Sequence, residues 1–147
     1  LFQNTVNTSM AAIKGMKKNN WGRIINMASV SVKEPLSYLA LSNTIRSAVT
    51  SWGKTLSIES GKHNVTVNNI LTGFFNTERL NQLNSEKAKK FNVSTEEVFD
   101  KMSEMVPIKR IGEPEEFGYL VAFLSSDYAD YINGTNIPID GGLLKSM

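Results

Sequence analysis

The chain has 147 residues, 41% of them hydrophobic and 20% charged, which is typical of one globular domain with its own apolar core. A formal net charge of +2 with dispersed basic residues argues against a nucleic-acid or membrane partner, and no apolar run approaches the roughly 18 residues of a membrane span. The absence of cysteine excludes disulfides, thiolate nucleophiles and cysteine-ligated metals, so we expect a cytoplasmic protein without a metal site.

The first part of the chain predicts a helix, a strand and a second helix. Val6, Met10 and Ile13 recur at helical spacing, so a helix is already under way at the start, and we expect the natural N-terminus to lie upstream. The run 23–30 (RIINMASV) is rich in β-prone residues and predicts a buried strand. A helical period of apolar residues then predicts the longest helix, over about 39–60.

The second part continues the alternation. The β-branched run 65–71 predicts a strand, and 78–105 predicts a helical lobe in which a capping box at 94–97 opens a short helix. Another helix is expected from Pro114, and a last strand covers 137–139. The expected core face of the helix from Pro114 consists of Phe117, Leu120, Val121, Phe123 and Leu124. This alternation is typical of an α/β protein in which helices cover both faces of a parallel sheet.

Three stretches, taken together and in this order, resemble the short-chain dehydrogenase/reductase family. They are Gly22–Ser29 (GRIINMAS), Val65–Thr77 (VTVNNILTGFFNT) and a long tail from Pro107 (PIKRIGEPEE) to Gly142 (DGG). The resemblance covers essentially the whole chain, and the tail is its most specific part. It implies that residues 1–147 form the C-terminal portion of a single doubly wound, Rossmann-like NAD(P)-binding domain with three layers, and that the lobe at about 78–105 shapes the substrate pocket.

The family resemblance also implies an activity. Its members are oxidoreductases that move a hydride between NAD or NADP and a carbonyl or alcohol, so a small molecule of that kind is the expected substrate. In the family a tyrosine hydroxyl handles the proton, a lysine binds the cofactor ribose and lowers the pKa of that tyrosine, and a serine orients the carbonyl. The family's glycine-rich phosphate loop has no counterpart in these residues, so the sequence does not discriminate NAD from NADP, and we expect the complete cofactor site to need that loop.

The catalytic residues implied by the resemblance are altered in this chain. Ser29, at the end of the predicted strand, matches the catalytic serine. The family spacing then places the tyrosine and the lysine at positions that hold Ser42 and Arg46. Arg46 keeps a positive charge near the expected cofactor, but its forked guanidinium is not equivalent to an ammonium group. An aliphatic hydroxyl at Ser42 is a far weaker acid than a phenol.

Tyr38 offers two alternatives. A gapped alignment puts it in the place of the family tyrosine, but Ser42 then stands at the lysine position, so we prefer the ungapped match. Alternatively, Tyr38 lies one turn before Ser42 on the same helical face, provided that the helix begins early enough. If it does not, we expect a loop tyrosine packed under the Pro35-Leu36 turn. The proton donor is therefore Tyr38, Ser42 or a bound water.

The segment 72–77 (TGFFNT) resembles the family's Pro-Gly-x-x-x-Thr segment, which lies under the nicotinamide. The resemblance implies cofactor contacts, and glycine would permit close approach of the backbone. A plain turn is the alternative. The residues assigned to the cofactor site are Ala28, Arg46, Thr72, Gly73, Phe75 and Thr77.

A second hypothesis is a non-catalytic binding or oligomerisation module derived from this family, because the catalytic residues are changed. In the family, helices equivalent to the first two predicted here pair across a dimer. The strand at 23–30 would also lack one neighbour in this chain, and an open edge favours pairing with another chain. We therefore expect a homodimer or homotetramer.

Overall fold

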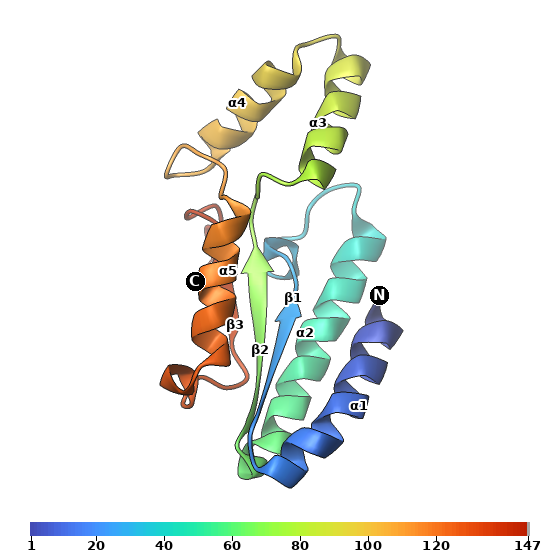
Figure 1. The fold of residues 1–147 in the computed structure, drawn as a ribbon. Helices are drawn as coiled ribbons and strands as arrows, with labels where there is room; N and C mark the ends of the chain where they lie inside the picture. Colours follow the sequence, from blue (N-terminus) through green and yellow to red (C-terminus); the bar gives the residue numbers. More distant parts are fainter. Residues whose placement is uncertain (147) are drawn as a thin grey trace.

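The computed structural model describes residues 1–146, which form a three-stranded parallel sheet with helices on both faces (Figure 1). The strands are β1 (Gly22–Met27), β2 (Val65–Thr72) and β3 (Asn136–Ile139), in the order β1-β2-β3. Strand β2 is central and buried along almost its whole length, as expected of a strand covered on both faces. The predicted α/β architecture is therefore confirmed.

Three helices form the outer layers of this sandwich. One face carries α1 (Phe2–Asn19) and α2 (Ala40–Ser60), and the other carries α5 (Pro114–Ser125) (Figure 1). Side chains alternate along β2, so Val65 and Val67 pack toward α1 and α2 while Ile70 packs toward α5. The predicted core face of α5 is largely correct, because four of its five residues lie in or against this second cluster.

The exception on α5 is Phe123, which is 44% exposed, so the expectation that it packs in the core is wrong. Its neighbour Leu124 is fully buried. At about 100° per residue, the four residues of α5 in or against the cluster span a sector of about 100°, and Phe123 points about 60° outside it.

Strand β1 also ends earlier than the sequence predicted. It stops at Met27 instead of Val30, and the chain turns into a short 3₁₀ helix over Val30–Val32. The hydroxyl oxygen of Ser29 caps this turn by accepting a hydrogen bond from the Ser31 backbone N–H at 3.2 Å. Ser29 therefore lies just past the carboxyl end of the strand.

Two further helices, α3 (Glu78–Phe91) and α4 (Thr95–Met105), extend beyond the carboxyl ends of β1 and β2 (Figure 1). Each begins at a side-chain cap: Thr77 accepts from the backbone N–H of Leu80 at 3.3 Å, and Ser94 accepts from that of Glu97 at 3.0 Å. Within residues 1–146, none of the helices has the length and apolar character that crossing a membrane requires.

A ladder of three asparagines crosses the sheet, and two of them, Asn26 and Asn69, are buried. Asn26 Nδ2 donates to Asn69 Oδ1 at 3.0 Å, and Asn69 Nδ2 donates to Asn136 Oδ1 at 2.8 Å. These residues are register partners on the three strands. Because buried amides need their hydrogen bonds, the ladder favours this register over a slipped one.

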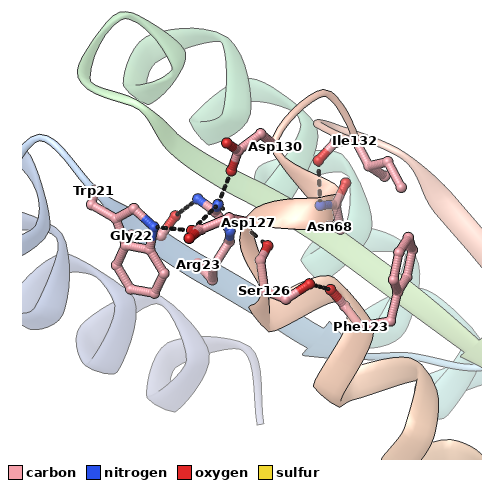
Figure 2. A network of polar contacts seen from close by, with 9 residues as sticks. All are labelled: Trp21, Gly22, Arg23, Asn68, Phe123, Ser126, Asp127, Asp130 and Ile132. Carbon is pink, nitrogen blue, oxygen red and sulfur yellow. Dashed lines mark hydrogen bonds and ion pairs between the residues drawn. The ribbon is translucent and has the colours of Figure 1, made fainter.

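A second polar network fastens the amino end of β1 to the segment after α5 (Figure 2). The Arg23 side chain is only 4% exposed and forms an ion pair with Asp130. Trp21 lies against it, with the guanidinium 4.8 Å from the ring centroid, and its indole N–H donates to Asp127 at 3.1 Å. This network lies at the end of the sheet away from Ser29.

Candidate active site

Three segments meet at the carbonyl oxygen of Ala28. This oxygen accepts hydrogen bonds from Arg46 Nη1 at 3.0 Å and from Thr72 Oγ1 at 3.1 Å. The contact joins the end of β1, the helix α2 and the end of β2. Ala28 directly precedes Ser29, so the Arg46 guanidinium lies beside the peptide bond that joins these two residues.

Arg46 also holds the second serine of the predicted set. Its Nε donates to Ser42 Oγ at 3.3 Å, one helical turn away. The Ser42 oxygen acts as acceptor in this contact, so its O–H is left to donate elsewhere. The same holds for Ser29, whose oxygen accepts from Ser31.

Tyr38 does not join this group. Helix α2 begins only at Ala40, and Tyr38 has a left-handed backbone with φ of 64°. Its side chain is fully exposed, so neither the shared helical face with Ser42 nor packing under the Pro35-Leu36 turn is found. Both expectations for this residue depended on where the helix begins.

Beside Arg46 lies an open cleft of about 460 Å³. Five of the six residues assigned to the cofactor line it, and Ala28 takes part only through its backbone carbonyl. Ser29, Ser42 and Tyr38 are not among the lining residues. The full lining consists of Met27, Arg46, Thr72, Gly73, Phe74, Phe75, Thr77, Arg79, Leu80, Leu83, Pro114 and Phe117.

Gly73 is required here by packing within the protein. A Cβ at this position would lie 2.8 Å from the Cα of Asp140, while the Gly73 N–H donates to the Ile139 carbonyl at 3.0 Å. The close approach of the chain after β3 thus explains the glycine without any ligand. Phe75 is held by an edge-to-face contact with Phe117, at 6.2 Å between ring centroids.

The lobe at about 78–105 was expected to shape the pocket, but the individual lining residues on this side of the cleft were not predicted from the sequence. Arg79, Leu80 and Leu83 come from the first turns of α3, and Pro114 and Phe117 come from α5. The helical spacing of Leu80 and Leu83 was the available signal, but the mostly polar composition around them masked it.

A further charged pair lies near the start of α5. Arg110 donates two hydrogen bonds to the Glu116 carboxylate, at 2.7 Å and 2.6 Å. These bonds, together with one from the Glu113 backbone N–H, lower the pKa of Glu116 to about 2. The positive charge of Arg110 is thereby compensated by the Glu116 carboxylate. No cluster of three or more potential metal-ligating side chains occurs among the described residues.

Comparison with known proteins yields sequence relatives that are reductases. NADPH-dependent reductase BacG of Bacillus subtilis is 37% identical over 132 residues, covering 90% of this chain and 51% of that protein. The 3-oxoacyl-[acyl-carrier-protein] reductase FabG of Pseudomonas aeruginosa is 30% identical over 138 residues, covering 94% and 51%. The chain thus spans about half the length of these curated relatives.

Solved structures agree with these sequence matches. The NADPH-dependent reductase YwfH, involved in bacilysin biosynthesis, superposes with a TM-score of 0.91 at 34% identity, covering 97% of this chain and 55% of that one. L-sorbose reductase from Gluconobacter frateurii, in complex with NADPH and L-sorbose, gives 0.91 at 31% identity, covering 97% and 54%. The family model for enoyl-(acyl carrier protein) reductase matches residues 2–144. This chain therefore belongs to the short-chain dehydrogenase/reductase family.

Proposed function

We propose that this chain carries the carbonyl-binding part of an NADPH-dependent reductase that acts on a small carbonyl compound. The observation that carries the proposal is the convergence of Ala28, Arg46 and Thr72 beside one cleft. NADP is proposed over NAD because BacG and YwfH are described as NADPH-dependent and the L-sorbose reductase binds NADPH. The same relatives favour a reductase over a module without activity.

The cleft is chemically suited to a nicotinamide ring. Its aromatic and aliphatic walls offer an apolar surface to the ring face. The Thr72 hydroxyl donates its hydrogen to the Ala28 carbonyl, so its oxygen can still accept a hydrogen bond. The Thr77 oxygen accepts from the Leu80 N–H, so its O–H can still donate one. A carboxamide offers both an N–H donor and a carbonyl acceptor, which these two hydroxyls match. When bound, the cofactor supplies the hydride.

The serines and Arg46 would handle the substrate oxygen. The Ser29 O–H is available to donate to the carbonyl, which orients it. As the oxygen gains negative charge, the Ser42 O–H transfers its proton to it, directly or through a water, and solvent reprotonates Ser42. An aliphatic hydroxyl is a weak acid. The Arg46 N–H that donates to the Ser42 oxygen would therefore stabilise the Ser42 alkoxide left after the proton transfer.

NADPH consumption in the presence of a carbonyl panel tests this function. The protein is expressed from its native gene with whatever sequence adjoins these residues. We expect Ser42→Ala to lower kcat/KM by about 10²-fold or more, as for loss of a general acid, and Tyr38→Phe to leave it unchanged. A large loss in Tyr38→Phe would reassign the proton donor. Absence of both NADPH binding and hydride transfer would refute the reductase.

We also infer that the isolated chain self-associates. The outer edge of β1 has no strand partner among residues 1–146, and a hollow of about 500 Å³ runs between this strand and α1. A sheet edge of this kind presents unpaired backbone donors and acceptors. A homodimer or homotetramer is the proposed assembly.

A further inference from the structure

The four arginines of the chain differ in their partners. Arg23 pairs with Asp130, and Arg110 pairs with Glu116. Neither of the other two, Arg46 and Arg79, lies within ion-pair distance of a carboxylate in the described part of the chain. Both of these line the same cleft beside Ala28.

No acidic residue is among those that line this cleft. Every other residue that lines the cleft is apolar, a glycine or a threonine. Arg46 is half-buried, and charges interact more strongly where water is partly excluded. Two cations and no anion within one hollow favour an anionic occupant.

The two arginines have different numbers of free donors. Arg46 already spends Nη1 on the Ala28 carbonyl and Nε on Ser42. The Arg79 side chain is exposed and forms no ion pair among residues 1–146, so its forked set of donors is available to a carboxylate. Its neighbours in the cleft, Leu80 and Leu83, provide an apolar surface for a carbon skeleton.

We propose that Arg79 selects a substrate with a carboxylate on an apolar body, an oxo acid whose carbonyl lies toward Ser29 and Ser42. This specificity rests on the proposed reductase function. Arg46 would hold the reaction centre while Arg79 binds the carboxylate. The phosphates of NADPH are the other possible source of the anion, and the experiment separates the two.

The first arm measures binding without catalysis, using 3-phenylpropionate and its uncharged amide as probes in isothermal titration. We expect the acid to bind about tenfold more tightly than the amide, as for a charged hydrogen bond. Arg79→Gln should abolish this preference, and Arg79→Lys should retain part of it. Lys87→Gln is the matched control, because it removes a charge from the same helix α3 at a position outside the cleft.

The second arm compares phenylpyruvate with its methyl ester as substrates and measures NADPH affinity. We expect Arg79→Gln to lower kcat/KM for the acid alone and to leave NADPH affinity unchanged. Equal binding of acid and amide by the wild type would overturn the proposal. So would a loss confined to NADPH, since the anion would then be a cofactor phosphate. An acid preference without any hydride transfer would support the carboxylate site and refute only the reductase.

Discussion

At the scale of single residues, Gly53 decides how closely α2 lies against the sheet. A Cβ at this position would lie 2.9 Å from both Asn26 Nδ2 and Asn69 Oδ1. Those amides are buried and hydrogen-bonded to each other, so they cannot move aside without breaking the ladder. The glycine therefore keeps α2, which carries Ser42 and Arg46, in contact with the strands.

We predict that Gly53→Ala lowers the free energy of unfolding by about 1–3 kcal/mol through overpacking. Gly15→Ala is the matched control, because Gly15 is also helical but an alanine Cβ there would meet no atom of another segment within 4 Å. At that position alanine should stabilise the protein by up to about 1 kcal/mol through helix propensity. Urea unfolding measures the free energy of unfolding of both variants. Equal changes in the two variants would show that the asparagine ladder is not rigid.

At the scale of elements, the start of α5 depends on charge. Pro114 opens the helix, and the Glu116 carboxylate accepts from the Glu113 backbone N–H at 2.8 Å as well as from Arg110. An anion in the first turn of a helix is also favoured by the helix dipole. Phe117 follows within the same turn and lines the cleft, so the cap supports one wall of the candidate site.

The lowered pKa of Glu116 predicts how this cap responds to pH. The ordinary value of 4.5 falls to about 2 in the folded state, so ionised Glu116 stabilises the fold above about pH 4.5, and that contribution is lost as the pH falls toward 2. We expect Glu116→Gln to be less stable than the wild type at neutral pH and equal to it near pH 2, as measured by urea unfolding. Glu115→Gln, on the same turn, should show no such convergence. If Glu116→Gln were less stable than the wild type by the same amount at every pH, the lowered pKa of Glu116 would be contradicted.

At the scale of the whole molecule, the sheet is asymmetric. Strand β2 is paired on both sides, whereas β1 pairs only with β2 among the described residues. Residues of α1 and β1 line the hollow along this edge, including Ala12, Met16 and Ile25. This surface is where we place the proposed contact with a second copy.

We predict that the isolated chain forms a dimer or larger assembly in light scattering. Ala12→Lys should shift it toward the monomer, because Ala12 lines the hollow and a buried lysine is costly. Ala11→Lys, one exposed position away and outside the hollow, should not. A folded monomer would refute self-association, and an assembly insensitive to Ala12→Lys would refute this surface.

The order and type of the main elements could be predicted because they depend on local patterns. The strand expected at 65–71 is observed at Val65–Thr72, and the helix expected at 39–60 is observed at Ala40–Ser60. Tyr38 shows the limit of such patterns. Whether it shares a helical face with Ser42 depends on a helix boundary, and a left-handed backbone at Tyr38 excludes it from the helix. Boundaries are the weakest part of any pattern-based assignment.

The candidate site likewise combines residues that the sequence predicted with contacts that only folding decided. The resemblance to the family's motifs assigned Ser29, Ser42, Arg46 and the segment 72–77, because a strand end and a separation of one helical turn can be matched along the chain itself. Folding decided that Arg79 from α3 joins Arg46 in one cleft, and that Arg23 and Arg110 find acidic partners while these two do not. Helical and strand periodicity are properties of neighbouring residues, whereas the pairing of a charge depends on which distant segments packing brings beside it.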